Sequence, residues 1–378
     1  MTGMRVSRVS TEEGFYSLKD EWNSLLGDSP ANNFFLRWEW LWSWWRAYRN
    51  ENSELCILVF SSQEGIVCIA PFYISGGKNK NKKMSFFSPR RLMFLGTSEE
   101  SLISEYMDII FRDGFENEAI EGALRVISDN CLCDDLLLHK IDFSSRTIPV
   151  MERAARKLGF FFSVCDRAES PYIRLPKSYG EFVGSLGKSM QRKIRTNKKR
   201  VAGHGGVVIR KSGPDGFASD FGEFVRLHQM RWHSKGMPGS FARGRFKGFQ
   251  AEVMLELLKK GFLDLWFLSV SGKNIAALYN INYKNKIYFF QAGLDAGFDK
   301  KLAPGFMLHD HCIREAIEGG LAEYDFLLMG GSDQYKKKWT DGSRPLGDIY
   351  LARPGALKYF LIAKDKAKNY LKAAGINR

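Results

Sequence analysis

The chain of 378 residues exceeds the usual ceiling for one hydrophobic core, so we expect two domains of about 150 to 200 residues each. Apolar residues make up 44% of the sequence and include 29 phenylalanines, which excludes an intrinsically disordered chain. Residues 1–170 carry 20 Lys and Arg against 24 Asp and Glu, a net charge of −4, whereas residues 171–378 carry 36 against 18, a net charge of +18. The second half is therefore expected to meet an anionic partner.

The first half alternates helix-like and strand-like segments. A helix pattern near the N-terminus is followed by the tryptophan-rich segment FFLRWEWLWSWWRAY and then by LCILVFSSQEGIVCIAPFYISG, two apolar runs around a Gln-Glu-Gly turn. This last segment predicts an antiparallel hairpin. Further strand-like runs surround helices predicted near residues 117–130 and 149–158. We therefore expect residues 1–170 to form a layered α/β or α+β domain.

Five tryptophans lie between positions 38 and 45. On a helix, Trp38, Trp42 and Trp45 share one stripe, which we expect to face the core. Trp40 and Trp44 point to the other side. This second pair is either buried under the neighbouring domain or forms an aromatic platform for a sugar or an acyl chain.

The pattern begins again in the second half. Helices are predicted near residues 179–201, 217–234 and 246–260, and they precede three strand-like runs, LDLWFLSVSG, IAALYNINY and IYFFQAGL, which form a meander. An Ala-Pro-Gly corner, a further helix and the short strand EYDFLLMG complete residues 171–350. Because both halves run from hairpin or meander to helix to strand, a duplicated domain is indicated.

Two segments concentrate positive charge. KSMQRKIRTNKKR, residues 188–200, has seven Lys and Arg around a narrow apolar stripe, and we expect a solvated helix face; contact with CoA phosphates, a nucleotide sugar, a lipid pyrophosphate or RNA is the alternative. Residues 351–378 have the pattern of a basic amphipathic helix, which is typical of a helix on anionic lipid. Packing of that helix onto its own protein is equally open.

The cysteines indicate a reducing compartment. None of the six forms a C-x-x-C pair, and the sequence has no His cluster at metal spacing, so we expect reduced, mostly buried thiols and no metal. They are Cys56, Cys68, Cys131, Cys133, Cys165 and Cys312. The N-terminus MTGMRVSRVS lacks the apolar core of a signal peptide, and no run of about 18 apolar residues predicts a membrane span. We expect a cytoplasmic protein that is soluble or peripheral on the inner face of the plasma membrane.

Five segments together resemble a known family. They are WEWLWSWW, LHQMRWHSKG, AALYNINYKNKIYFFQAGLD, LAPGFMLHDHCIREAIEGG and YDFLLMGGSDQYKKKW. In order and spacing they are similar to the CelD/BcsL-type acyltransferases associated with bacterial exopolysaccharide and cellulose synthesis, which are related to the Fem peptidyltransferases. The resemblance covers about residues 10–345. It implies two tandem GNAT-like (acyl-CoA N-acyltransferase) domains, each a mixed, largely antiparallel sheet flanked by helices.

The resemblance also implies a donor site. In the GNAT fold, the pyrophosphate of acyl-CoA lies on amides of a strand-to-helix turn, which here corresponds to residues 301–306. Pro304 suits a first helical turn, and Gly305 leaves room for a phosphate. The residues implied to bind the donor are Gln291, Gly293, Lys301, Ala303, Gly305 and Phe306. GNAT loops usually have more than one glycine, and this loop has one, so a plain strand-to-helix turn is the alternative.

Acyl transfer to an amine needs a base, an oxyanion donor and an acid for the leaving thiolate. The segment YDFLLMGGSDQYKKKW offers Asp325 as the base or as a residue that orients the acceptor. The amides of Gly330 and Gly331 face the substrate in this interpretation, and Tyr335 with Lys336 acts as the acid or as a charge clamp. A cap or a salt bridge is the alternative for Asp325, and a solvated basic run is the alternative for Lys336.

A second group is expected to bind the acceptor. His228 and Arg231 lie three residues apart on a helix, so both can reach one pocket, and Trp232 can stack on a sugar ring. We assign these three residues and Gly331 to substrate binding. His309, which lies on an apolar helix face, is expected to be structural.

These expectations combine into one function with two alternatives. The resemblance implies transfer of an acyl group, acetyl from acetyl-CoA, to an amino-sugar or lipid-linked glycan intermediate of exopolysaccharide or capsule assembly, without a metal. The second domain would hold the donor, and the first would be mainly structural. The alternatives are a Fem-like transferase that takes an amino acid from aminoacyl-tRNA, with the basic half on RNA, and a non-catalytic polysaccharide-assembly factor.

Overall fold

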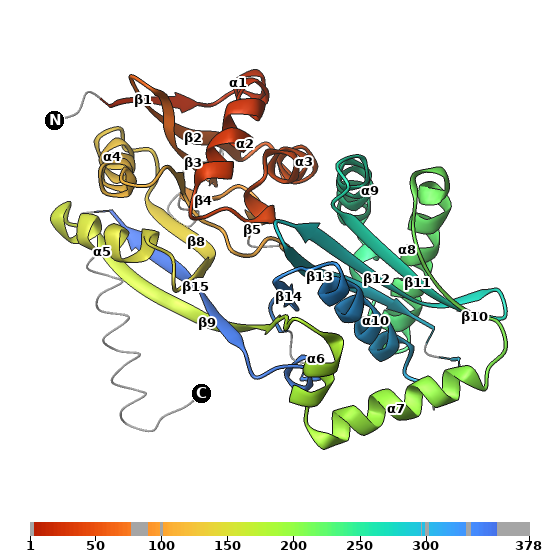
Figure 1. The fold of residues 1–378 in the computed structure, drawn as a ribbon. Helices are drawn as coiled ribbons and strands as arrows, with labels where there is room; N and C mark the ends of the chain where they lie inside the picture. The colour runs from red at the N-terminus through yellow and green to blue at the C-terminus, as the bar shows by residue number, and fades with distance from the viewer. Residues whose placement is uncertain are drawn as a thin grey trace, which may run out of the picture. The chain divides into compact units, whose positions relative to one another are not determined.

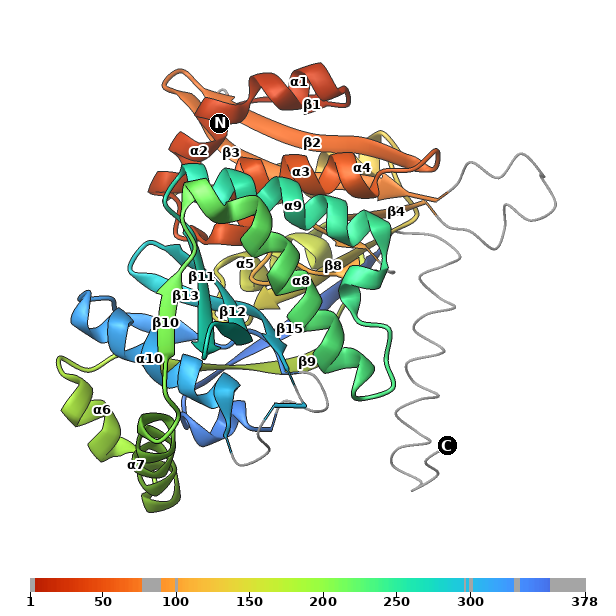
Figure 2. The same cartoon turned by 90° about the vertical axis from the view of Figure 1, so that its right-hand side faces the viewer.

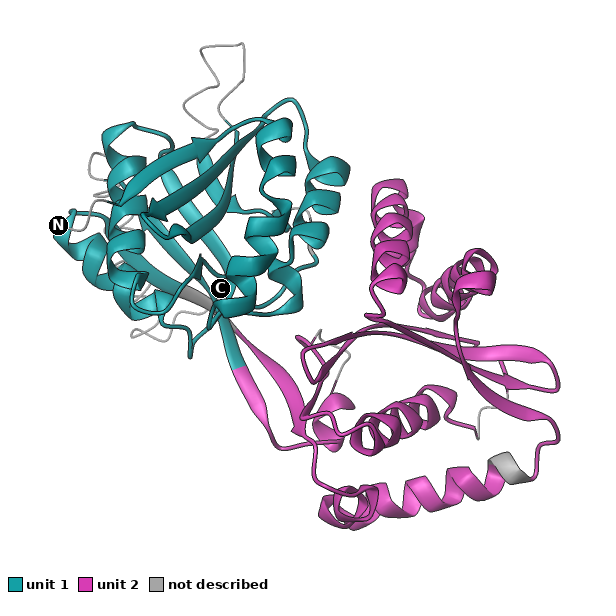
Figure 3. Ribbon diagram, turned by 45° about the horizontal axis from the view of Figure 1, so that its top comes forward, with its two compact units in different colours: residues 1–167, 345–378 teal, residues 168–344 magenta. Residues whose placement is uncertain are grey.

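The computed structural model describes residues 4–76, 90–98, 101–295, 297–298, 302–329 and 334–353. The chain forms two compact units (Figure 3). Unit 1 comprises residues 1–167 and 345–378, and unit 2 comprises residues 168–344. Two strands, β9 (Phe161–Arg174) and β15 (Ser343–Ala352), run from one unit into the other.

Unit 1 contains short helices and a mixed sheet (Figure 1). Its strands are β1 (Arg5–Val9), β2 (Ser53–Ser62), β3 (Gly65–Ser75), β4 (Arg91–Phe94), β5 (Thr97–Ser98), β6 (Ser101–Leu102), β7 (Ile110–Phe111) and β8 (Asp135–Asp142). Its helices are α1 (Glu12–Ser17), α2 (Lys19–Asp28), the 3-10 turn η1 (Phe34–Leu36), α3 (Trp38–Tyr48), α4 (Glu116–Asp129) and α5 (Thr147–Lys157). The strand order is β1-β2-β3-β4-β8-β15, and β2 and β3 form the expected antiparallel hairpin.

The tryptophan-rich helix α3 is packed into unit 1. Trp40 and Trp44 are each 1% exposed, so the aromatic platform suggested for this pair is wrong. The indole N–H of Trp40 donates to Ser104 Oγ at 2.8 Å, and Trp44 stacks on Tyr48 with ring centroids 5.5 Å apart. The half-buried member of the opposite stripe is Trp42, which stacks on buried Trp38.

Unit 2 repeats the combination of helices and a largely antiparallel sheet. Its helices are α6 (Tyr179–Ser185), α7 (Lys188–Ala202), α8 (Phe217–His233), α9 (Gly244–Lys259) and α10 (Pro304–Glu318), with 3-10 turns η3 (Pro214–Gly216), η4 (Ser240–Ala242) and η5 (Lys336–Lys338). Its strands are β10 (Val207–Lys211), β11 (Leu263–Val270), β12 (Lys273–Tyr283), β13 (Lys286–Leu294) and β14 (Glu323–Asp325), in the order β9-β14-β13-β12-β11-β10. The three predicted strands of the meander are β11, β12 and β13.

Helices cover both faces of the sheet of unit 2 (Figure 3). One face packs against α6, α7 and α10 through a core that includes Phe182, Ile194, Ile313 and Leu278. On the other face, α8 lies on β12 and β13, and α9 lies on β11. This is the mixed α/β architecture, largely antiparallel with flanking helices, that the sequence predicts. Within the described residues, no helix is both long and apolar enough to cross a lipid bilayer.

Candidate active site

The candidate site lies where the pairing between strands β13 and β14 ends. The parallel strands β13 and β14 pair only from Lys286 to Tyr288, opposite Glu323 to Asp325. β13 continues beside β12 as far as Leu294. In the described part of the chain, no strand extends the β14 ladder beyond Tyr288. This edge of β13 therefore offers main-chain hydrogen-bonding groups to an extended ligand.

β13 is also irregular at this point. Its register with β12 shifts between Tyr279 and Asn280, whose partners on β13 are Gln291 and Phe289. Phe290 is thus an extra residue, and such a bulge bends the strand and re-aims its main-chain groups. The bend follows directly on the end of the β14 pairing.

Helix α10 begins soon after β13. Pro304 occupies its first turn, the capping residue Ala303 makes no side-chain cap, and the first turn has no acidic residue. The helix therefore starts with uncapped main-chain N–H groups and partial positive charge. The predicted strand-to-helix corner is confirmed, and Ala303, Gly305 and Phe306 lie at it. Lys301 lies outside the described residues.

A lysine from α7 lies at this helix start. Lys193 Nζ is 4.2 Å from the centroid of the Phe306 ring, which stacks on Trp339 with centroids 4.5 Å apart. Partial burial, and then the nearby Lys338, lower the pKa of Lys193. The ammonium group of Lys193 thus lies at the start of α10, with the positive charge of Lys338 acting on it, an arrangement that suits a bound phosphate. The sequence places Lys193 on a solvated face and does not identify it.

His309 lies on α10, which packs on one face of the sheet of unit 2. Its Nδ1 is 3.0 Å from the Tyr324 hydroxyl, and its ring centroid is 4.5 Å from that of Phe289. Burial, with Lys336 and Arg231 adding repulsion, lowers the pKa of His309 to about 3. The imidazole is therefore neutral near pH 7, buried and hydrogen-bonded, as expected for a structural residue.

Positive charge on Lys336 and on Arg231, which belongs to α8 on the opposite face of the sheet, acts on His309. Lys336 is 5% exposed. Its Nζ donates to the carbonyls of Phe326 and Leu328 at 2.8 Å each, and to that of Leu327 at 3.4 Å. These bonds fix the chain that follows β14, so the ammonium group here has a structural task beside its predicted catalytic one. The ring of Tyr335 lies 6.0 Å from that of His309.

Asp325 is fully buried at the end of β14. Its carboxylate accepts from the Leu327 N–H at 2.8 Å and the Ser170 hydroxyl at 3.1 Å. It also pairs with Lys286 at 3.2 Å and with Arg344 at 3.4 Å. Burial opposes the charge on Lys286, but Asp325, Tyr288 and Glu323 outweigh it and raise the pKa of that lysine. The geometry favours the salt-bridge interpretation of Asp325, while its role as a base stays a prediction.

His228 and Trp232 interact directly on α8. His228 is 1% exposed, and its Nε2 accepts from the indole N–H of Trp232 at 3.0 Å. Its Nδ1 lies 3.2 Å from Gln229 Oε1. Burial lowers the pKa of His228 to about 4, with Arg231 also lowering it. A neutral His228 thus orients Trp232. The bond links two of the residues that the sequence predicts to bind the acceptor.

Gly293 and Gln291 lie on β13 beside α8. A Cβ added to Gly293 would lie 2.7 Å from the main-chain nitrogen of His228, so this glycine allows the strand to approach the helix closely. Gln291 Oε1 is buried without a hydrogen-bond partner in the described residues, and so is the hydroxyl of its cross-strand neighbour Tyr279. Gly331, like Gly330, lies outside the described residues, as does the predicted helix from residue 354 onward.

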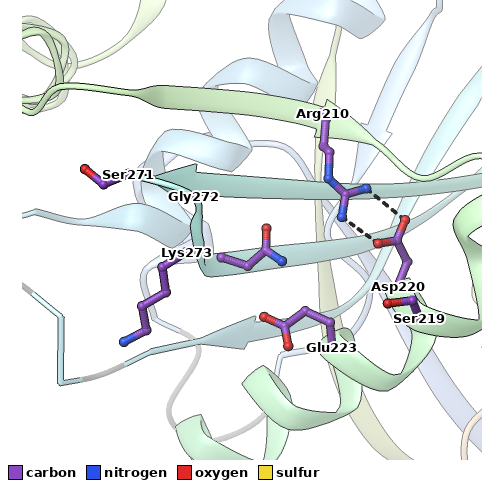
Figure 4. Close-up of a pocket in the computed structure, with 8 residues that line it drawn as sticks. Arg210, Ser219, Asp220, Glu223, Ser271, Gly272 and Lys273 are labelled. Carbon is purple, nitrogen blue, oxygen red and sulfur yellow. Dashed lines mark hydrogen bonds and ion pairs between the residues drawn. The ribbon is translucent and has the colours of Figure 1, made fainter.

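A separate surface hollow lies at the other end of α8 (Figure 4). It has a volume of about 590 Å³ and is lined by Arg210, Ser219, Asp220, Glu223 and residues 271–274. Its charges are paired: Arg210 and Asp220 form a bidentate ion pair at 2.8 and 2.5 Å, and Lys273 binds Asp295 at 2.7 Å. None of the predicted site residues lines it. In the described part of the chain, no group of three or more His, Cys, Asp or Glu side chains is arranged to hold a metal ion.

The comparisons with known proteins concern the family and the fold. Residues 188–337 match the family model described as Acetyltransferase (GNAT) domain. No curated protein is significantly similar in sequence to the chain. The structure of FemX is similar with a TM-score of 0.61 and 11% identity, over 92% of this chain and 96% of that one.

Two further solved structures share the fold. A conserved protein of unknown function from Bacteroides thetaiotaomicron has a TM-score of 0.59 and 12% identity, over 92% of this chain and all of that one. L-PGS from Bacillus licheniformis has a TM-score of 0.51 and 13% identity, over 91% and 94%. At such identities the likeness shows the fold alone. The family match to residues 188–337 assigns a GNAT-like acetyltransferase domain to unit 2.

Proposed function

We propose, since residues 188–337 match a GNAT acetyltransferase domain, that the protein is an acyltransferase. It would transfer an acyl group, acetyl from acetyl-CoA, to an amine of a glycan intermediate. The CelD/BcsL-type resemblance supports an amino-sugar or lipid-linked glycan of exopolysaccharide or capsule assembly as the acceptor. Peripheral attachment to the inner face of the plasma membrane through the C-terminal segment belongs to the same proposal.

One observation carries this function: the open edge of β13 leads to an uncapped helix start that is flanked by lysine. In this proposal an acyl carbonyl would meet main-chain N–H groups beside the bulge at Phe290 and the end of the β14 ladder at Tyr288. The start of α10, with Lys193, lies where a pyrophosphate would be held. The residues present therefore fit the donor.

Acetyl-CoA supplies an activated thioester. Attack by the acceptor amine forms a C–N bond and breaks the C–S bond, while the amine loses a proton and the thiolate gains one. Tyr335, whose ring lies 6.0 Å from that of His309, is the candidate acid for the thiolate. Arg231, whose charge acts on His309, is the candidate that provides positive charge for the developing oxyanion or for the acceptor. His309 stays neutral and holds Tyr324 in place.

A second function is favoured by a different observation on α7. Lys188, Arg192, Arg195 and Lys199 recur along one side of the helix and are exposed. In the described residues, no carboxylate pairs with any of them. Such a row suits a polyanion, and a donor such as aminoacyl-tRNA would use it.

The test is calorimetric titration of acetyl-CoA into the full chain. We expect binding by the wild type and an affinity about tenfold weaker for Lys193→Ala, which removes one charged contact to a phosphate. Lys199→Ala, which removes an exposed charge from the same helix, is the matched control and should bind acetyl-CoA like the wild type. A wild-type protein that ignores acetyl-CoA, together with RNA binding that weakens in Lys199→Ala, would replace the first function by the second.

A further inference from the structure

Two polar side chains on the sheet of unit 2 lack the hydrogen bonds that their burial calls for. The hydroxyl of Tyr279 on β12 has no partner in the described residues, although Tyr279 is 0% exposed. Gln291 on β13 is half-buried, but its Oε1 is covered and is likewise without a partner in that part of the chain. Unpaired buried polar groups destabilise a folded protein, so a bound ligand is one reason to keep them.

The two side chains are neighbours on one face of the sheet. Tyr279 and Gln291 lie directly opposite each other in the antiparallel ladder of β12 and β13. Side chains in such a pair have Cβ atoms about 5 Å apart. The Tyr279 ring packs against Phe224 of α8, with centroids 6.0 Å apart, so the pair lies on the face that α8 covers. The two groups do not bond to each other, and both are available to a third partner.

The pair lies beside residues that the sequence predicts to bind the acceptor. Helices α8 and α9 lie side by side over this face of the sheet (Figures 1 and 2). Gly293 follows Gln291 by two residues and therefore points to the same face. A Cβ added to Gly293 would lie 2.7 Å from the main-chain nitrogen of His228, and His228 accepts from the indole N–H of Trp232 at 3.0 Å. Packing and a hydrogen bond thus connect the pair to Trp232.

The pair also adjoins the bulge of β13. Phe290, the extra residue of the bulge, directly precedes Gln291, and its ring centroid lies 5.1 Å from that of Tyr279. Consecutive Cα atoms are about 3.8 Å apart, so a group held by the Gln291 amide is close to any ligand atom at the main chain of Phe290. In the proposed reaction the acceptor amine attacks an acyl carbonyl beside this bulge. A group bound by the pair is therefore close to that amine.

A hydroxyl group satisfies both polar atoms at once. Gln291 Oε1 only accepts hydrogen bonds, whereas the Tyr279 hydroxyl is able to donate one. Burial raises the pKa of Tyr279 well above its usual value, so the phenol keeps its proton. A ligand O–H that donates to Gln291 and accepts from Tyr279 completes both bonds with one oxygen. A carboxylate has no proton for Gln291, and an ammonium group has no lone pair for Tyr279.

We propose that Tyr279 and Gln291 bind a hydroxyl group of the acceptor, on the carbon next to the reacting amine, and select acceptors that carry it. This inference rests on the proposed acyl transfer and adds two specificity-determining residues to it. The acetyl group of the proposed donor has no hydroxyl, so the bound hydroxyl belongs to the acceptor. Gln291, which the sequence assigns to the donor, contacts the acceptor in this proposal.

The experiment measures acetyl transfer from acetyl-CoA to two matched amines. One is the methyl glycoside of glucosamine, which has a hydroxyl beside its amine, and the other is the 3-deoxy analogue, which lacks that hydroxyl. The full chain is compared with Tyr279→Phe and Gln291→Met, which remove the polar atoms and largely keep the shape. Tyr324→Phe is the matched control for stability, because Tyr324 is also fully buried but its hydroxyl lies 3.0 Å from His309 Nδ1.

We expect the wild-type kcat/KM to be about tenfold or more lower for the 3-deoxy amine, because both polar atoms then stay unpaired. In Tyr279→Phe and Gln291→Met this discrimination should shrink to less than about threefold, whereas a merely structural change would affect both amines equally. Acetyl-CoA titration should give wild-type affinity for both variants. Tyr279→Phe should melt no lower than the wild type, and Tyr324→Phe should melt lower, since only the second loses a hydrogen bond.

The possible results separate this inference from the proposed function. A wild type that acetylates both amines equally overturns the inference alone; if Tyr279→Phe then also melts lower, a buried water completes the two bonds instead of a ligand. An equal loss with both amines in Tyr279→Phe assigns that residue a structural role and overturns the inference as well. A wild type that acetylates neither amine refutes the proposed acyl transfer together with this inference.

Discussion

Buried charges at the end of β14 determine what Asp325 can do. Four side chains, Lys286, Glu323, Asp325 and Arg344, bind each other across β13, β14 and the start of β15. A charge buried in this way is stable only while its partners remain, because the desolvation cost of each is high. The network fixes β14 in the place from which the open edge of β13 starts.

The substitution Asp325→Asn should therefore destabilise the protein. The new amide oxygen can still accept from the Leu327 N–H, but the neutral side chain leaves Lys286 and Arg344 with too little negative charge nearby. We expect a loss of about 3 kcal/mol in the free energy of unfolding. Urea unfolding measures it. If Asp325 is instead only a catalytic base, stability will be unchanged while the acyl-transfer rate loses its dependence on a basic group.

Local sequence patterns predicted some helices and strands correctly and others only in part. The hairpin of β2 and β3, the meander, and the corner before α10 are visible in the sequence because turn residues and apolar runs are local signals. The predicted helix over residues 179–201 is two helices, since the chain turns at Leu186 and Gly187.

The contacts that build the site could not be predicted in the same way. Lys193 meets Phe306 only because α7 packs beside α10, and Asp325 meets Lys286 across two strands. The charge of Arg231 acts on His309 from a helix on the opposite face of the sheet. These are tertiary meetings of residues far apart in sequence, and helix or strand periodicity carries no information about them. The sequence thus located the strand-to-helix turn before α10 but not the charged residues around it.

The contact between β13 and α8 gives a prediction at the level of elements. In Gly293→Ala the new methyl group would meet the main chain of α8 at 2.7 Å, which should cost about 1 to 3 kcal/mol through overpacking. Gly305→Ala is the matched control, because its methyl group meets the flexible Leu294 side chain at 3.1 Å. Thermal melting should separate the two variants. Equal stability would mean that α8 moves away from β13 without cost.

At the scale of the whole molecule, the two units differ in their buried titratable groups. In unit 1, burial raises the pKa of Asp108 from 3.8 to about 6. In unit 2, burial lowers the pKa of His228 from 6.5 to about 4. Asp108 thus binds a proton more tightly in the folded state than in the unfolded state, and His228 binds one more weakly.

The contributions of Asp108 and His228 to stability should respond oppositely to pH. The contribution of Asp108 is present below pH 3.8 and is lost as the pH rises through about 6. That of His228 is present above pH 6.5 and is lost as the pH falls towards about 4. Hydrogen exchange, corrected for the intrinsic rate, should show peptides of α8 losing protection between pH 7 and 4.5. Peptides around Asp108 should gain protection, and Asp108→Asn should abolish that gain. The prediction is contradicted if, in the wild type and in Asp108→Asn alike, the peptides of α8 and those around Asp108 change protection in the same direction.

The path of β15 has a consequence for synthesis on the ribosome. β8, its partner in unit 1, is complete at Asp142, whereas β15 starts at Ser343 after all of unit 2. About 200 residues separate them, so at ordinary translation speeds the edge of β8 waits on the order of 10 to 40 seconds for its neighbour. Synthesis of unit 1 thus starts before that of unit 2 and ends after it. A nascent chain that is halted within unit 2 exposes the edge of β8 to chaperones or to other chains that aggregate.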